Sequence, residues 1–370
     1  MNDRLYADIH VIETLPPSCV NRDDLGSPKT AFYGGVTRAR VSSQAWKRAV
    51  RLEFMRKKEN TGERTKHTLD LVAKEIENLD SAIENPDELA KEALKNAFAS
   101  KKNKKEKETE ELKLDVLVFI SKEQVKALAQ TAVSYKDKNK KDKGIAKEFK
   151  ADCKAALKSK PSIDIALFGR MIANDDSLNY DAAAQVAHAI STHEVHNEYD
   201  YFTAVDDQQP ADDSGAGHVG TTEFNSSTMY RYATVNVLEL AKNLDEDVPH
   251  VVRAFMEAFV RTMPTGKQNS FANRVRPDAV YITVRRDQPV NMAGAFEKPV
   301  QAGKNGYVEG SVQRLIDYAK ETYQDYYDAP SLELVVGSGM DAVGEKMPLS
   351  AMLDKLEEYL TKALVEEESR

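Results

Sequence analysis

Within residues 36–58 the apolar pattern changes from that of a strand to that of a helix, and this change constrains the fold more than any other feature of the chain. The stretch reads VTRARVSSQAWKRAVRLEFMRKK. Polar and apolar side chains alternate over residues 37–41, which is the pattern of a strand or an extended loop. Ser42 is a good helix N-cap, and the apolar residues after it recur at every fourth position: Trp46, Val50 and Phe54. We therefore predict an extended segment that runs directly into an amphipathic helix.

The same stretch is strongly basic, with eight Lys or Arg side chains against one carboxylate, Glu53. The first backbone N–H groups of a helix have no intrahelical partner, so together with nearby hydroxyls and cations they can hold a phosphate. The side chains of this kind around the predicted helix start are Arg40, Ser42, Ser43, Gln44, Lys47 and Arg48. The stretch suits a polyanion, although a solvated basic face on an ordinary amphipathic helix explains the pattern equally well.

Composition limits the class of protein. The chain has 370 residues, of which 41% are hydrophobic, so it can form one or two domains with a real core. Its formal net charge is −8, so any surface for nucleic acid has to be local. The cysteines, Cys19 and Cys153, lack metal-type spacing, and no apolar run approaches the length of a membrane span. We expect a cytoplasmic protein without a disulfide framework, a cofactor or a membrane partner.

The middle of the chain differs from the rest. Residues 59–160 are rich in Lys, Glu and Ala and have helical periodicity, with a short apolar run at 114–120 that could be a strand. One basic run, 101–107, is too charged to be buried, and another basic run follows at 136–150. We interpret this block as an inserted helical subdomain whose lysines form a solvated surface, although two such runs could also contact a nucleic-acid backbone.

The remaining elements predict an α+β fold. The expected strands are 6–14, 163–171, 226–240 and 279–285. The expected helices are 182–192, 251–263, 312–327 and 349–365. Residues 197–225 have the pattern of a hairpin with an aromatic arm, and 15–35 that of a long polar loop. Without insertions the order is strand, helix, strand, strand, helix, strand, as in the ferredoxin-like fold of RNA-recognition domains.

Few residues suggest catalysis. A metal-like group of His188, His193, His196, Asp206, Asp207 and His218 lacks the spacing of a helical zinc pair, so a structural or surface role is favoured. Asp23 and Asp24 could act as an acid pair, but pairing with Arg22 or capping of the turn is the simpler interpretation. Four loop residues could stack on or wedge between bases, although a core role is favoured for any single one of them: Phe32, Tyr33, Met171 and Phe202.

Several blocks of the chain together resemble one family. They are PSCVNRDDLGSPKTAFYGG with RARVSSQAWKRAVR, IDIALFGRM, VAHAISTHEVHNEYDYFTAVDD, GHVGTTEFNSSTMYRYATVNV, TGKQNSFAN and NMAGAFEKPV. In this order they resemble the CasC (Cse-four) family, the backbone subunit of the type I-E CRISPR Cascade complex. The likeness runs over nearly the whole chain and is weakest over 59–158 and the last thirty residues.

The resemblance implies a protein that binds RNA and is not an enzyme. It implies a palm with an RNA-recognition-type fold at 1–58, 161–197 and 225–370, helical fingers at 59–160 and a thumb hairpin at 198–224. Copies would assemble head to tail along a CRISPR guide RNA beside other Cascade subunits, leaving most guide bases free to pair with target DNA.

The resemblance also implies roles for single residues. It places RNA contacts at Arg40, Ser42, Ser43, Gln44, Lys47 and Arg48, and base-displacing wedges at Met171 and Phe202. Lysines of the fingers would attract target DNA, namely Lys136, Lys138, Lys140 and Lys141. The alternative is a metal-dependent nuclease that cuts target RNA with a loop aspartate, Asp23 or Asp24.

Overall fold

The computed structural model describes residues 4–98, 117–172, 175–204, 218–244 and 247–369. The chain divides into two compact units. The sheet unit consists of Met1–Glu53, Gln185–Leu238 and Pro249–Arg370, and the helical unit of Phe54–Ala184 and Glu239–Val248. No helix in the described ranges combines the length and the apolar character that a membrane span requires.

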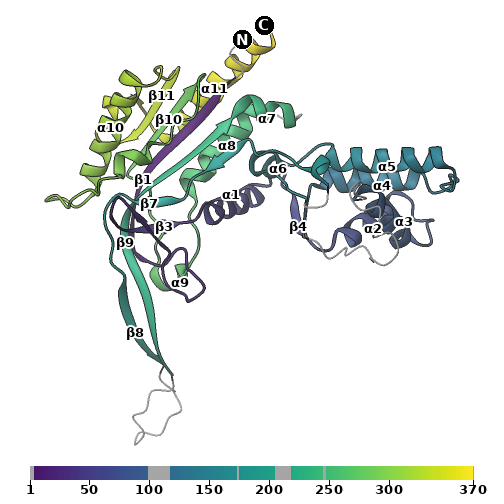
Figure 1. The fold of residues 1–370 in the computed structure, drawn as a ribbon, viewed down its shortest axis with the longest axis horizontal. Helices are drawn as coiled ribbons and strands as arrows, with labels where there is room; N and C mark the ends of the chain where they lie inside the picture. Colours follow the sequence, from purple (N-terminus) through teal and green to yellow (C-terminus); the bar gives the residue numbers. More distant parts are fainter. Residues whose placement is uncertain (1–3, 99–116, 173–174, 205–217, 245–246, 370) are drawn as a thin grey trace, which may run out of the picture. The chain divides into compact units, whose positions relative to one another are not determined.

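One large mixed sheet organises the sheet unit (Figure 1). Its strands follow the order β12-β11-β10-β1-β9-β7-β3-β2, and β6 and β8 pair with β9 off this path. The strands are β1 (Tyr6–Ser18), β2 (Thr30–Tyr33), β3 (Val36–Val41), β6 (Ala184–Val186), β7 (Ala189–Ser191), β8 (Glu198–Ala204), β9 (His218–Asn236), β10 (Ala279–Arg285), β11 (Leu332–Gly337) and β12 (Glu345–Lys346). Helices combined with one large sheet agree with the predicted fold class at its coarsest level.

The centre of the sheet is a split β-α-β unit. Strand β1 lies antiparallel to both β9 and β10, so these two neighbours run parallel to each other. The connection between them includes helix α8 (Val248–Arg261), and the connection from β10 to β11 includes α10 (Val308–Asp325). The other helical elements of the unit are α9 (Gln268–Phe271), η2 (Met292–Phe296), η3 (Met340–Ala342) and α11 (Leu349–Glu368), with α1 (Ser43–Lys57) beginning in this unit.

The two faces of the sheet bury different chemistry. On one face, Arg231 of β9 pairs with Glu13 of β1, and its guanidinium lies 3.7 Å from the centre of the Trp46 ring of α1. On the other face, α10 and η2 cover an apolar and aromatic cluster that includes Tyr230 and Tyr281. Because residues alternate along a strand, one strand supplies both cores, and β1 is buried over most of its length.

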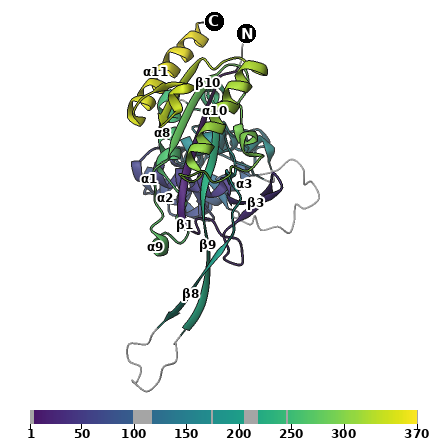
Figure 2. The ribbon, with the colours of Figure 1, turned by 90° about the vertical axis from the view of Figure 1, so that its left-hand side faces the viewer.

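A two-stranded ribbon leaves the sheet at the start of β9 (Figures 1 and 2). Strand β8 pairs antiparallel with the first part of β9, from Glu198 opposite Phe224 to Ala204 opposite His218. All seven residues of β8 are exposed. The hairpin predicted at 197–225 is therefore present over the described residues, while 205–217, its predicted tip, lie outside them.

The helical unit has its own core. Helices α2 (Thr68–Leu79), α3 (Pro86–Ala97), α4 (Lys122–Ser134) and α5 (Lys143–Lys158) bury residues such as Ile76, Leu94, Leu128 and Phe149 among themselves. A small sheet pairs β4 (Glu63–Thr65) with β5 (Val118–Ile120), and the unit also contains α6 (Ile163–Phe168) and η1 (Asp176–Leu178). Most of α7 (Val237–Asn243) belongs to it as well. The basic run 101–107 lies outside the described residues.

Two predicted elements have the wrong type. The apolar pattern of residues 163–171 predicts a strand, but they form helix α6, which ends where Gly169 takes a positive φ of 79°. A short, largely apolar run does not distinguish a buried helix from a buried strand. Residues 182–192 are predicted as a helix, but they form strands β6 and β7 because the sheet pairs them with β9. Tertiary pairing here overrides the helical propensity of alanine.

The predicted loop 15–35 is also shorter than expected. Strand β1 continues through Pro16 and Pro17 to Ser18, and the register against β9 shifts between Leu15 and Ser18. A bulge of this kind accommodates residues without a backbone N–H donor. Strand β2 then occupies part of the same stretch and pairs with β3.

Candidate nucleic-acid interface

Strand β3 runs into helix α1 as the sequence predicts, and Ser42 stands at the junction. The N–H group of Ala45 donates to the Ser42 carbonyl oxygen at 3.0 Å and lies 3.4 Å from Ser42 Oγ. The N–H of Ser42 donates to Asn21 Oδ1 at 2.9 Å. Ser42 is buried, so its hydroxyl serves the helix start, while Asn21 fixes the junction from the preceding loop.

Arg40 is oriented by neutral groups. Its Nε donates to the carbonyl oxygen of Thr30 at 3.0 Å, and its Nη1 lies 3.0 Å from Nδ1 of His188. Partial burial, followed by the charges of Arg40 and Lys29, lowers the pKa of His188. The imidazole is therefore neutral at neutral pH and accepts the hydrogen bond, because a guanidinium can only donate. Arg40 thus keeps its full positive charge in a fixed orientation.

Arg38, two residues earlier on β3, has a different role. Its side chain is fully buried and donates to four carbonyl oxygens: Tyr33 at 3.2 Å, Ser191 at 2.8 Å, Phe296 at 2.8 Å and Glu297 at 3.2 Å. These bonds tie β3 to β7 and η2. Charge alone does not distinguish Arg38 from Arg40, but burial makes Arg38 a structural residue.

The first turns of α1 carry the remaining predicted contacts. Gln44 and Arg48 are exposed and lie four residues apart, so they share one face of the helix. Ser43 and Lys47 share the adjoining face and are partly buried. The structure thus brings the six predicted residues onto one strand-to-helix junction, and their contact with RNA stays a prediction.

Met171 projects from a fixed backbone in the helical unit. On one side, the backbone of Arg170 exchanges hydrogen bonds with Tyr180 at 3.1 and 2.9 Å, and its buried guanidinium donates to the carbonyls of Leu157 and Leu178. On the other side, the N–H of Ile172 donates to Asn179 Oδ1 at 2.6 Å. Met171 itself is 85% exposed. An apolar side chain that solvent reaches from a rigid support is suited to contact a base.

Phe202 lies on the hairpin of the sheet unit. It is 42% exposed, whereas the neighbouring Tyr199 and Tyr201 are 68% and 65% exposed. Of the other aromatic candidates, Phe32 is 78% exposed on β2, and the Tyr33 hydroxyl donates to the Ala293 carbonyl at 3.3 Å. Phe32 is therefore not a core residue, and its contact with a base stays a prediction.

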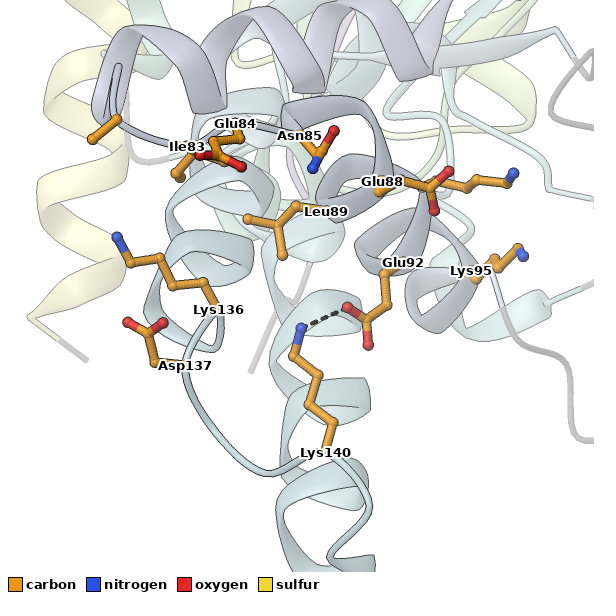
Figure 3. A pocket seen from close by; sticks show the side chains of 12 residues that line it. Ile83, Glu84, Asn85, Glu88, Leu89, Glu92, Lys95, Lys136, Asp137 and Lys140 are labelled. Atoms are coloured by element: carbon orange, nitrogen blue, oxygen red, sulfur yellow. Dashed lines mark hydrogen bonds and ion pairs between the residues drawn. The ribbon is translucent and has the colours of Figure 1, made fainter.

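The four candidate lysines of the helical unit differ in their surroundings, and Figure 3 shows two of them, Lys136 and Lys140. Lys136 Nζ lies 2.6 Å from Asp80 Oδ2, and Lys140 Nζ lies 2.5 Å from Glu92 Oε2. Lys138 Nζ lies 3.6 Å from the centre of the Tyr135 ring, and Lys141 is exposed. Lys136 and Lys140 line a groove with acidic residues of α3, including Glu88 and Glu92. Two of the four candidate lysines are thus paired with carboxylates.

Comparison with known proteins identifies the family. A profile described as CT1975-like protein matches residues 7–361. The chain belongs to the CT1975-like family. No curated protein matches it. Two solved structures are similar, titled "CRISPR RNA-guided surveillance complex, pre-nicking" and "CRISPR RNA-guided surveillance complex". The first has 34% identity, a TM-score of 0.79, and 95% of this chain and 100% of that chain covered. The second has 30% identity and a TM-score of 0.62, with 96% of this chain and 99% of that chain covered.

The acidic loop of this CT1975-like chain forms a turn. Asp23 Oδ1 accepts hydrogen bonds from the N–H groups of Leu25 at 3.0 Å and Ser27 at 2.9 Å. Gly26 has a φ of 94°, which favours glycine. For Asp23, this geometry agrees with the turn-capping role favoured from the sequence.

Over the parts of the chain that the structure describes, the histidines do not gather into a metal site. His193 stacks on Tyr307 with ring centres 3.6 Å apart, and its Nε2 accepts from the N–H of Thr228 at 3.0 Å. Within the described ranges, no three His, Cys, Asp or Glu side chains gather as metal ligands. Asp206 and Asp207 lie outside those ranges.

The sequence does not reveal that His188 orients Arg40, because His188 falls into one group with the other histidines. His188 lies 148 residues from Arg40 in sequence and reaches it because β3 pairs with β7. Only a contact prediction between these two strands could have revealed this pair.

Proposed function

We propose that this chain is a CasC-type backbone subunit of a type I-E Cascade complex, which binds the CRISPR guide RNA and has no catalytic activity of its own. The junction of β3 and α1 is the observation that carries the proposal. There, the charge of Arg40 is held by a carbonyl and a neutral imidazole, and the exposed Gln44 and Arg48 follow on the first turns of the helix. The titles of the similar structures, which name RNA-guided complexes, support it.

The chemistry of this junction suits a phosphate backbone better than a base sequence. Guanidinium, amide and helix N–H donors bind phosphate oxygens, which are the same in every RNA. A subunit that carries any guide has to bind in this way, since base edges change from one guide to the next. Affinity should therefore be equal for unrelated guides and sensitive to salt.

The projecting side chains complete the proposal. Met171 and Phe202 would displace guide bases at intervals, with residues 198–224 as a thumb and 59–160 as fingers on a ferredoxin-like palm. A head-to-tail contact between copies is heterologous and need not close into a ring. Copies would thus continue along the RNA, beside other Cascade subunits, and present the intervening bases to target DNA.

A test of guide binding should use two guide RNAs with unrelated spacers of equal length. We expect dissociation constants within about twofold of each other, because phosphate contacts carry no sequence information. A difference of more than about tenfold, which corresponds to roughly 1.4 kcal/mol, would indicate base readout and contradict the proposal.

The nuclease alternative has its own test. The protein is incubated with guide RNA, complementary RNA and Mg²⁺, and the RNA is resolved on a denaturing gel. We expect no cleavage, since Asp23 is engaged in its turn. Metal-dependent cuts at regular spacing that disappear in Asp24→Ala would establish the nuclease instead.

A further inference from the structure

Gly220 lies directly opposite Phe202 in the β8–β9 hairpin. A β carbon built on Gly220 would lie 2.4 Å from Cζ, 2.8 Å from Cε1 and 3.1 Å from Cε2 of Phe202. The three nearest atoms thus all belong to one aromatic ring, so the ring occupies the space that any other residue at 220 would fill. Glycine within a strand commonly marks such a close approach.

The ring lies on the face of the hairpin that the sheet unit braces. Opposite residues and every second residue along a strand share a face, so Phe202, Gly220, Thr222 and Phe224 all point to the same side. Lys267 Nζ donates to Thr222 Oγ1 at 3.2 Å, and Phe224 packs against Phe271 of α9 with ring centres 5.7 Å apart. Two rungs of this face are thus held by the segment around α9, and the next rung is the glycine.

We propose that Gly220 is a positioning residue for Phe202. Its missing side chain lets the ring lie across the hairpin, so that one side of the ring rests on the backbone and the rest is presented to a flat apolar partner, a nucleic-acid base. This inference rests on the proposed function, which assigns Phe202 as a wedge. It explains why Phe202 is less exposed than Tyr199 and Tyr201, which point to the opposite side.

Gly220→Ala tests the proposal without removing the ring. The clash is with the far end of a side chain, so the ring can turn away while the hairpin keeps its register. Thr221→Ala is the matched control, because Thr221 is the next residue, is exposed, and faces the side of Tyr201. Each protein is bound to a series of guide RNAs that carry one 2-aminopurine at successive positions, since this base brightens when it leaves the stack.

The wild-type protein should give fluorescence maxima at regular intervals along the guide. We expect Gly220→Ala to lose most of the height of these maxima while its affinity for the guide stays within about threefold, because the phosphate contacts lie elsewhere. Thr221→Ala should match the wild type. Maxima of wild-type height in Gly220→Ala, or an equal loss in both variants, would overturn the inference.

A double-variant cycle separates positioning from a general effect on the hairpin. If Gly220 acts through the ring, Gly220→Ala should change nothing further once Phe202→Ala has been made. Additive losses would overturn the inference. A wild-type protein that binds the guide but shows no maxima would instead contradict the wedge role, and with it the proposed function on which this inference rests.

Discussion

The junction of β3 and α1 and the basic run 136–150 look alike in sequence but differ in how their charges are held. At the junction, Arg40 is bound by a carbonyl and by an imidazole whose pKa is lowered, two neutral acceptors that leave its charge in place. In the basic run, Lys136 and Lys140 form ion pairs with Asp80 and Glu92. The first arrangement preserves a local positive field, and the second reduces it.

This comparison shows that a count of basic residues does not locate a polyanion site. The partner of each cation decides whether its charge can attract a polyanion, since a neutral acceptor fixes the side chain without opposing its charge. We therefore expect substitutions at the junction to affect nucleic-acid binding strongly, and substitutions of the ion-paired lysines to affect it weakly.

The largest effect is expected from Arg40→Ala combined with Arg48→Ala. Each charge-assisted hydrogen bond to phosphate that the substitutions remove should weaken guide binding on the order of tenfold, equally for all spacers. The slope of log K against log salt should fall by about 0.7 per phosphate no longer neutralised in single-stranded RNA. A filter-binding titration at several salt concentrations measures both, and a loss of affinity confined to some spacers would mean base readout.

Inside the sheet unit, two buried groups, Asp8 and His10, have opposite effects on how folding stability depends on pH. Burial raises the pKa of Asp8 to about 6 and lowers that of His10 to about 3. Asp8 accepts from the Val290 N–H at 2.9 Å and from the Tyr232 hydroxyl at 3.2 Å. His10 Nδ1 lies 2.9 Å from the Tyr230 hydroxyl.

The proton balances of these two groups have opposite signs. Between pH 6 and 3.8, folded Asp8 keeps a proton that the unfolded chain has released, so acidification through this window favours folding. Over the same window, folded His10 lacks a proton that the unfolded chain has bound, so acidification disfavours folding. The two contributions cancel as long as both groups are present.

Asp8→Asn should leave the effect of His10 on the pH dependence of the unfolding free energy uncompensated. As the pH falls from about 6 to about 4, the variant is expected to lose roughly 1.4 kcal/mol of unfolding free energy per pH unit relative to the wild type. Urea denaturation across this range measures the difference, and asparagine retains an oxygen to accept from Val290. Parallel pH profiles for the two proteins would show that the pKa of Asp8 is not raised in the folded state.

A smaller effect is expected from His188→Ala. Removing the acceptor of Arg40 Nη1 leaves the guanidinium charged but less well oriented, at a cost of about 0.5–1.5 kcal/mol in guide binding. His188→Gln, whose amide oxygen can accept the same bond, should recover part of the loss. Guide affinities of the three proteins at one salt concentration test this, and an effect of alanine equal to that of Arg40→Ala would mean that His188 contacts RNA itself.

The smallest effect is expected from Lys136→Ala combined with Lys140→Ala. This double variant removes the same charge as Lys138→Ala combined with Lys141→Ala. However, Lys136 and Lys140 already form ion pairs with carboxylates. Exposed ion pairs contribute about 0–1 kcal/mol to stability, so both double variants should remain folded. Duplex DNA association at low salt should fall more in the second pair, and equal losses would remove the distinction between the two pairs of lysines.

Much of the fold could be predicted where local pattern and tertiary context agree. The strand predicted at 279–285 has the bounds of β10, and the alternating pattern of 37–41 followed by the Ser42 cap locates the β3–α1 junction. Prediction is wrong where only tertiary contacts decide, as at α6 and at β6 and β7. The same limit applies to the site, because the sequence indicates Arg40 but not the His188 that orients it.

The central claim is that this chain holds guide RNA by its phosphates and assembles along it. The most direct measurement combines guide affinity over a salt series with size-exclusion chromatography on guides of increasing length. We predict salt-sensitive affinity that is equal for unrelated spacers, and particles that grow with RNA length. A compact oligomer of fixed size, or affinity that salt does not change, would contradict the account.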